Sequence, residues 1–371
     1  MKSLVCPRCS AELVEDAWEE LQETNDGGII LGGYPAYVCR EQCGYAKRIE
    51  SIPPIIVQPE APNLFQFATS ELSQDAFLCY LIAWSSKRYR LLDEPLHEAA
   101  VHFISTIFNA HGITAPTVET VTIERQFKSL DIFAVINDTY AIVIEDKTFT
   151  DDHSDQLVRY REAVKREFPN LIQLPVYYKI ADQSQYHSAI AAGYVPFKRE
   201  MMIRILKDGI AKGVTNTIFL DYYRHLQKLE DKYCSFRTTP VSEWDSYAWQ
   251  GFYQEIQKSI DGEWGYVPNR SGGFWAFWWK SVLGEKYYMQ LEQTRLCVKV
   301  EAEEGEDKRE LRKIALVEVL GESGKRDLHL KRPTRLGTGK TMTIAHRLDY
   351  IQTNVAGMAD ISRTVEELKK Y

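Results

Sequence analysis

Asp131, Glu145 and Lys147 are residues that can bind a cation and stabilise charge on a phosphate, and they stand at the ends of two strand-like stretches. Residues 132–136 and 140–144 are apolar, and the Asn-Asp pair between them favours a turn. We therefore expect a hairpin that brings Asp131 close to Glu145. A three-residue loop would place these two residues directly opposite each other, whereas a two-residue loop would require a bulge.

Side-chain alternation along the second strand puts Glu145 and Lys147 on one face and Asp146 on the other. Two neighbouring carboxylates can hold one or two Mg²⁺ (or Mn²⁺) ions, which prefer oxygen ligands. Such an ion lowers the pKa of a bound water, and a lysine beside it can stabilise the charge that develops on a phosphate. The pattern predicts phosphodiester hydrolysis. The alternative is an ordinary amphipathic hairpin whose charged ends are solvated and whose ion pair is incidental.

Two flanking segments favour the hydrolytic interpretation. FATSELSQDAFLCYLIAW (residues 67–84) precedes the hairpin, and QLVRY (residues 156–160) follows it. Together with Asp131 and the Glu-Asp-Lys triplet at 145–147, these segments resemble the PD-(D/E)XK nuclease superfamily over residues 65–160. One position departs from that pattern, because Leu130 stands where the family motif has proline.

The resemblance implies a restriction-endonuclease-like core and a role for each matching residue. Asp131 and Glu145 would bind the metal, and Glu71 would be an additional carboxylate on the metal side. Lys147 would be the catalytic lysine, and Gln156 would support the site. The resemblance also implies an Mg²⁺-dependent endonuclease, with DNA favoured over RNA, in defence against foreign DNA or in DNA processing.

Four of the seven cysteines form two closely spaced pairs near the N-terminus: Cys6 with Cys9, and Cys39 with Cys43. Four thiolates in tetrahedral arrangement make a closed, structural Zn²⁺ site, and the strand-like segments between the pairs fit a zinc ribbon. The second pair has three intervening residues, one more than most ribbons have. Unpaired buried cysteines are the alternative. A redox-active pair is disfavoured, since no thioredoxin-like pattern surrounds it.

The chain divides into segments of different composition. Residues 1–51 would form the zinc ribbon, and residues 52–63 a stiff linker with four prolines. Residues 64–235 alternate predicted helices and strands, which indicates an α/β (α+β) core with a mixed sheet flanked by helices. Residues 240–371 would form a Trp-rich α+β C-terminal domain.

Apolar periodicity predicts individual elements within these segments. A helix over residues 70–84 would begin at the N-cap Ser70 and pack through a stripe made of Leu72, Ala76, Cys79, Tyr80 and Ala83. Further helices are expected over residues 96–110, 154–168, 215–232, 244–260 and 308–320 and at the end of the chain. Strands are expected over residues 120–136 with a break, 140–147, 174–180, 273–279, 286–291 and 296–301, and near Leu328 and Met342.

The net charge of −7 argues against a protein that coats nucleic acid through bulk charge. A phosphate-contacting surface is expected near the basic stretch 308–340, which could also be a solvated helix face. The sequence has no membrane-spanning apolar run and no secretory signal at its start, so we expect a cytoplasmic location.

Three further signals carry less weight. The segment 337–341 (GTGKT) lacks the first glycine of a Walker A loop and is interpreted as a turn. The aromatic run 274–279 (FWAFWW) could stack nucleobases, but core packing on both strand faces is the favoured interpretation. His153 could contact a phosphate or a metal-bound water, and an ordinary loop histidine is favoured.

Two alternative functions remain open at this stage. The first is a non-catalytic nucleic-acid-binding or protein-adaptor module that uses a degenerate nuclease scaffold. The second is a nuclease that acts on RNA. A protein partner could dock on the zinc ribbon or on the C-terminal domain, and a homodimer is compatible with the sequence.

Overall fold

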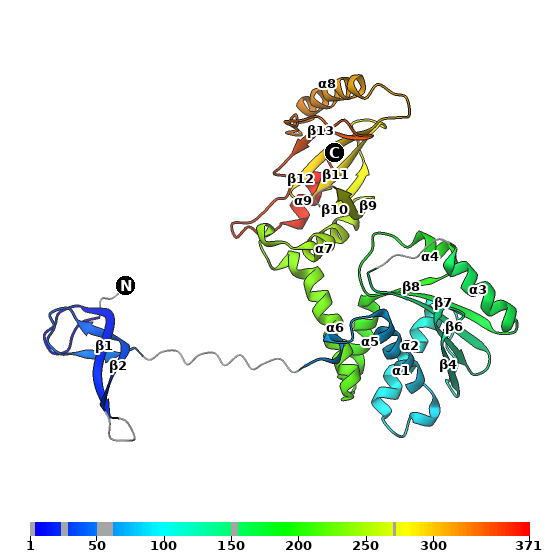
Figure 1. Ribbon diagram of the computed structural model, residues 1–371, viewed down its shortest axis with the longest axis horizontal. Helices are drawn as coiled ribbons and strands as arrows, with labels where there is room; N and C mark the ends of the chain where they lie inside the picture. Colours follow the sequence, from blue (N-terminus) through cyan, green and yellow to red (C-terminus); the bar gives the residue numbers. More distant parts are fainter. Residues whose placement is uncertain (1–3, 24–28, 50–61, 150–154, 270–271) are drawn as a thin grey trace. The chain divides into compact units, whose positions relative to one another are not determined.

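A computed structural model describes residues 4–23, 29–49, 62–149, 155–269 and 272–371 (Figure 1). The chain forms two compact units, Met1–Ala61 and Pro62–Tyr371. Nearly all of the predicted Pro-rich linker, and His153, lie outside the described residues. Among the described residues, no helix is long and apolar enough to cross a membrane.

The first unit is built on an antiparallel three-stranded sheet in the order β1-β2-β3, seen on the left of Figure 1. Its strands are β1 (Leu13–Glu23), β2 (Ile29–Cys39) and β3 (Ala46–Arg48). The first pair of cysteines precedes β1, and the second begins at the last residue of β2. The fold therefore brings both pairs to one end of the sheet.

The second unit begins with a mixed sheet in the order β4-β5-β6-β7-β8. The first three strands are antiparallel and the last two run parallel to β6. Their bounds are β4 (Val121–Phe127), β5 (Leu130–Ile136), β6 (Tyr140–Lys147), β7 (Ile172–Lys179) and β8 (Val195–Lys198). The predicted break in the first strand is confirmed as the turn between β4 and β5.

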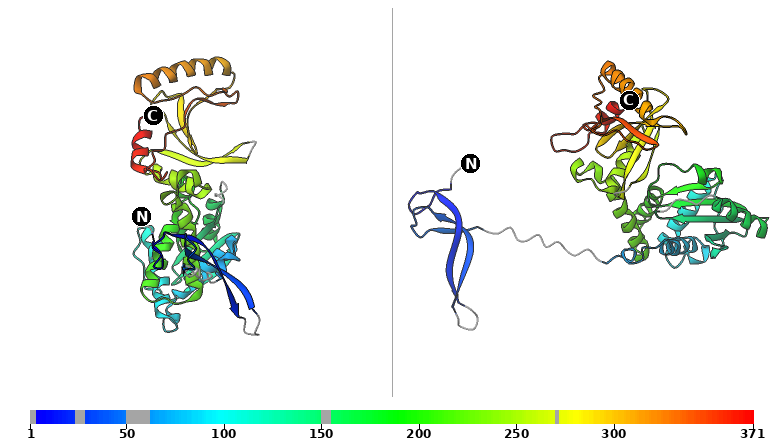
Figure 2. Two further views of the ribbon diagram at one scale, coloured as in Figure 1. Left: turned by 90° about the vertical axis from the view of Figure 1, so that its left-hand side faces the viewer. Right: turned by 45° about the horizontal axis from the view of Figure 1, so that its top comes forward.

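Helices cover both faces of this sheet, as the two views of Figure 2 also show. One apolar core joins the sheet to α1 (Glu71–Trp84), α2 (Glu94–Ala110), α5 (Arg199–Ala211) and α6 (Thr217–Cys234). A smaller core on the other face joins it to α3 (Gln156–Glu167) and α4 (His187–Ala191). The α/β class with a mixed sheet flanked by helices is confirmed, although α4, β8 and α5 were not predicted.

The predicted packing face of α1 is only partly confirmed, since Cys79 and Tyr80 pack against the core whereas Leu72 and Ala76 are exposed. Leu72 is half exposed, whereas Gln74 and Asp75 are buried together with Phe77, Leu78, Leu81 and Ile82. Apolar periodicity misplaced the face because two polar side chains occupy its first turn and point toward the sheet. Ser70 is the N-cap residue, but its hydroxyl makes no capping hydrogen bond to the helix.

The C-terminal part of this unit is an antiparallel sheet in the order β13-β12-β11-β10-β9. Its strands are β9 (Gly262–Asn269), β10 (Gly272–Lys280), β11 (Tyr287–Glu292), β12 (Arg295–Glu301) and β13 (Thr341–Arg347), with helices α7 (Ser246–Gln257), α8 (Lys308–Arg326) and α9 (Ile361–Leu368). Short 3-10 helices are η1 (Leu64–Gln66), η2 (Lys87–Tyr89), η3 (Ser235–Arg237) and η4 (Val241–Glu243).

Two strand predictions in this part differ from the structure. β9 was not predicted, because glycine and proline interrupt its apolar alternation. The strand expected near Leu328 is wrong, since that residue lies in a loop that forms only an isolated bridge at Lys331. The segment 337–341 has no helix after it and leads into β13, as the turn interpretation requires.

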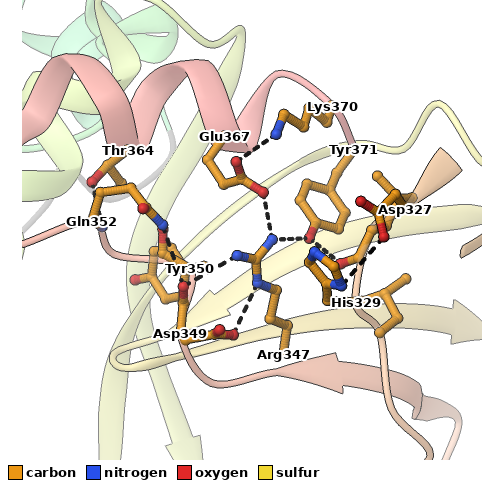
Figure 3. Close-up of polar contacts among 12 residues, drawn as sticks. Asp327, His329, Arg347, Asp349, Tyr350, Gln352, Thr364, Glu367, Lys370 and Tyr371 are labelled. Atoms are coloured by element: carbon orange, nitrogen blue, oxygen red, sulfur yellow. Dashed lines mark hydrogen bonds and ion pairs between the residues drawn. The ribbon is translucent and has the colours of Figure 1, made fainter.

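Hydrogen bonds of the buried Arg347 side chain connect α9 to this sheet (Figure 3). The guanidinium of Arg347 donates to the carboxylates of Asp349 and Glu367 and, at 2.8 Å, to the hydroxyl of Tyr371. That hydroxyl in turn donates to the carbonyl of Leu328. Arg347 and Tyr371 are almost fully buried, so these bonds compensate the cost of removing an arginine from water.

Candidate active site

The β5–β6 hairpin has the three-residue loop that places Asp131 beside Glu145. Ile132 pairs with Ile144 and Ile136 with Tyr140, without a bulge. The pairing continues to Asp131, whose carboxylate accepts a 2.8 Å hydrogen bond from the backbone N–H of Asp146. The loop is compact because Asn137 and Asp138 both adopt the left-handed conformation, which these two residue types tolerate better than most.

Glu145 and Lys147 share the sheet face that α3 covers. The ammonium of Lys147 lies 2.7 Å from the Glu145 carboxylate. On the helix, the Gln156 amide donates to the same carboxylate at 3.0 Å and to the Tyr160 hydroxyl at 2.7 Å. Gln156 and Tyr160 lie one helical turn apart, so α3 presents both to the strand. The structure thus brings together the predicted Asp131, Glu145, Lys147 and Gln156.

Glu71 approaches the site from the N-terminal turn of α1. Its carboxylate accepts a 2.9 Å hydrogen bond from the backbone N–H of Thr148, the residue that follows β6. It does not join Asp131 and Glu145 in one compact set. Among the described residues, only the cysteine cluster gathers three or more such ligand atoms closely enough to hold a metal ion.

Burial and repulsion between negative charges raise the pKa values of the two neighbouring carboxyl groups. Burial, reinforced by the charge of Asp131, raises the pKa of Glu145 to about 7. Burial also raises the pKa of Asp131, although the N–H of Asp146 opposes the shift. Burial alone would lower the pKa of Lys147, but its hydrogen bond and charge interaction with Glu145 raise it, so this lysine stays protonated.

A polar chain behind β6 was missed by the sequence interpretation. The Gln74 amide donates to the buried Asp146 carboxylate, and Tyr222 donates to Gln74 at 3.2 Å. The hydroxyls of Tyr222 and Tyr178 are 2.9 Å apart. Strand alternation had placed Asp146 on this face, but a glutamine and two tyrosines from distant segments gave no spacing signal. The chain supports Asp146, whose backbone N–H holds Asp131.

The four N-terminal cysteines form a second candidate metal centre. Their sulfur atoms all lie within 4.8 Å of one another, with Cys6 and Cys43 at 3.5 Å and Cys9 and Cys39 at 3.2 Å. Ligands about 2.3 Å from a tetrahedral ion would be about 3.8 Å apart. The donor set and its spacing therefore fit a zinc ribbon. The second pair has one extra residue between its cysteines, and the left-handed conformation of Gln42 accommodates it.

Comparison with known proteins identifies the family of the central part of the chain. Residues 68–245 match the family model of the PD-(D/E)XK nuclease superfamily. The core of this chain belongs to that superfamily. No curated protein and no solved structure gives a significant match to the chain. The matched region contains the β5–β6 hairpin, α1 and α3, and hence the PD-(D/E)XK core includes the whole candidate site.

The residues of the PD-(D/E)XK core fit the divalent cation that this superfamily typically uses. One carboxylate oxygen of Glu145 is buried and has no hydrogen-bond donor among the described residues, and the Asp131 carboxylate lies beside it. The single ammonium of Lys147 cannot neutralise two neighbouring carboxylates, so a cation would be attracted to the site. Oxygen donors of this kind suit Mg²⁺ or Mn²⁺.

Proposed function

We propose that this protein is a metal-dependent nuclease that cleaves phosphodiester bonds at the centre formed by Asp131, Glu145 and Lys147. The proposal rests mainly on one buried oxygen of Glu145, next to Asp131, that has no hydrogen-bond donor among the described residues. The Lys147 ammonium contacts the other oxygen of that carboxylate. A site built only for stability would satisfy the first oxygen, because an unpaired buried charge costs several kcal/mol. Membership of the PD-(D/E)XK nuclease superfamily supports the same function.

Asp131 and Glu145 would hold the Mg²⁺ or Mn²⁺ ion, and Glu71 would assist from the first turn of α1. When bound, the ion would supply an activated water and neutralise charge on the phosphate. Lys147 would keep its proton and donate to the phosphate oxygens as negative charge develops. Gln156 would fix the Glu145 carboxylate from α3 and limit its rotation.

DNA is the proposed substrate, because the family resemblance favours it over RNA, and internal cleavage is the proposed mode. The cysteine cluster would hold structural Zn²⁺ and take no part in the chemistry, since four thiolates leave no open position on the ion. Separate roles are consistent with the location of the two centres in different compact units.

The function is tested with purified full-length protein, supercoiled plasmid and, in parallel, RNA. We expect plasmid cleavage in Mg²⁺, none in EDTA, and a loss of at least about 100-fold in Asp131→Ala and Lys147→Ala. Asp138→Asn is the matched control, because Asp138 is an exposed aspartate in the turn of the same hairpin. Cleavage that survives EDTA or Asp131→Ala contradicts the mechanism. Folded protein that cleaves neither substrate points to an adaptor, and cleavage of RNA alone corrects the substrate.

A further inference from the structure

A groove of about 600 Å³ separates the nuclease core from the edge of the C-terminal sheet. One wall comes from the end of β7 and the loop before α4, and the other from the β9–β10 hairpin. Its volume lies in the range of sites that bind a small organic ligand. The residues that line it include Phe149, Lys179, Gln183, Tyr266, Trp275 and Trp278.

The hairpin wall carries three aromatic side chains that are partly exposed. Tyr266 is 52% exposed, and Trp275 and Trp278 are half-buried, in contrast to the buried Trp279. Gly273 and Gly265 leave the space that the rings of Tyr266 and Trp278 occupy, because a Cβ at either glycine would meet the ring at 2.5 or 3.1 Å. Within the aromatic run 274–279, some side chains therefore pack in the core and others line the groove.

Hydrogen bonds across the groove hold its two walls together. The backbone N–H of Trp264 on the edge strand β9 donates to the Ser184 hydroxyl at 2.8 Å. The Gln257 amide of α7 donates to the Ser184 carbonyl at 3.0 Å. In the same loop, the side-chain carbonyl oxygen of Gln183 is buried and has no donor among the described residues.

The groove begins one strand away from the candidate catalytic lysine. Lys179 is the register partner of Lys147 in the parallel β6–β7 pair, and neighbouring strands lie about 4.8 Å apart. Phe149, two residues beyond Lys147, is 62% exposed and also lines the groove. A nucleic-acid strand with a phosphate at Lys147 could therefore continue toward the groove.

The charges of the groove favour an uncharged ring over a phosphate in its centre. Asp182 is already paired with Arg199 at 2.8 Å, and Glu263 on the hairpin wall is exposed. A phosphate between these carboxylates would be repelled, and Lys179, which also lines the groove, is almost fully buried. Flat apolar rings with hydrogen-bonding edges match these walls, and nucleobases have this chemistry.

We propose that this groove binds an unpaired nucleobase of the substrate by stacking it on one of the aromatic side chains with which the β9–β10 hairpin lines the groove. The proposal rests on the nuclease function, since the strand in the groove is the strand that continues to Lys147. It predicts that the enzyme requires single-stranded character next to the cleavage position, so supercoiled plasmid would be cleaved where its duplex is locally unpaired. Duplex DNA cannot present a base to the groove without unpairing it.

The test measures binding without cleavage, in full-length Asp131→Ala protein. Labelled single strands of about 12 nucleotides, as DNA and as RNA of the same sequence, are compared with blunt duplex by fluorescence anisotropy. We expect single strands to bind more tightly than duplex and to quench tryptophan fluorescence. Tyr266→Ala should weaken single-strand binding roughly ten-fold, and Tyr266→Phe, which keeps the ring, should restore it.

Phe67→Ala is the matched control, because Phe67 is an aromatic residue that is 79% exposed and does not line the groove. Trp278→Ala provides a second groove variant, and thermal unfolding checks that each variant is folded. Unchanged single-strand affinity in Tyr266→Ala and Trp278→Ala, or equal affinity for duplex, overturns the groove proposal. If groove-dependent binding occurs but wild-type protein never cleaves in Mg²⁺, only the nuclease proposal fails.

Discussion

The cysteine cluster and the carboxylate pair are two candidate cation sites that are built in opposite ways. The cysteines come from two short turns around one small sheet, and their four sulfur atoms are already gathered. The carboxylate centre draws on β5, β6, α1 and α3, and within the described part of the chain one oxygen of Glu145 has no hydrogen-bond donor. The first arrangement is closed and suits a structural ion, whereas the second is incomplete and suits chemistry.

The difference lies in what each region gains from a cation. The first unit buries few apolar side chains among its described residues, so an ion would supply much of its folding free energy. The second unit has extensive apolar cores and can fold around an unfavourable carboxylate pair. The large apolar cores stabilise the fold enough to offset the unfavourable free energy of burying two carboxylates side by side. This contrast can be tested separately in each unit.

The largest effect is expected from removing a sulfur ligand. Cys6→Ser should abolish stoichiometric zinc and unfold the first unit, because apparent zinc-binding free energies of about 10 kcal/mol or more contribute directly to folding. Cleavage by the second unit should stay within about two-fold of wild type. Zinc analysis and thermal unfolding measure the first effect, and a cleavage assay the second. Cys234→Ser, outside the cluster, is the control. Zinc retained in Cys6→Ser would disprove the closed four-sulfur site.

A smaller effect is expected when the helix support of Glu145 is removed. Gln156→Ala leaves all proposed ligands in place but frees the Glu145 carboxylate, so we expect a 10- to 100-fold loss in metal affinity or in kcat. Metal titration and steady-state kinetics distinguish these two parameters. Arg159→Ala on the exposed side of α3 should change neither. Activity equal to wild type in Gln156→Ala would show that β6 alone orients the carboxylate.

The smallest effect concerns stability in EDTA. Because the folded pKa of Glu145 is raised to about 7, folded protein binds a proton more tightly than unfolded protein does. Glu145 therefore contributes stability below its unfolded pKa, and that contribution is lost as pH rises through 7. Urea unfolding between pH 5 and 8 should show Glu145→Gln gaining roughly 1–3 kcal/mol relative to wild type as pH rises. A constant difference across this range would argue that neither burial nor the charge of Asp131 raises the pKa of Glu145 in the folded protein.

Local features of the site were predictable, and long-range ones were not. The hairpin register depends on a loop of three residues, and alternation separates Asp146 from Glu145. The packing face of α1 was only partly predicted, because Gln74 and Asp75 are buried polar residues, which apolar periodicity cannot register. The short elements α4 and β8 carry too few residues to show a period.

The aromatic groove could not be derived from sequence spacing. Ser184 and Trp264 meet across it although 80 residues separate them. The aromatic run predicted either core packing or base stacking, and the choice depended on which rings face the β7–α4 loop. Gly265 and Gly273 are visible in the sequence, but their partners become evident only from the strand pairing.

Binding of a divalent cation by the carboxylate pair is the central claim, and it can be measured without knowing the substrate. Mn²⁺ is titrated calorimetrically into zinc-loaded full-length protein, into Asp131→Ala and into the Asp138→Asn control. We predict saturable binding of one or two ions per chain in wild type and in the control, and its loss in Asp131→Ala. Equal Mn²⁺ binding by Asp131→Ala and wild type, or none by folded wild type, would contradict the assignment of this pair as the metal centre.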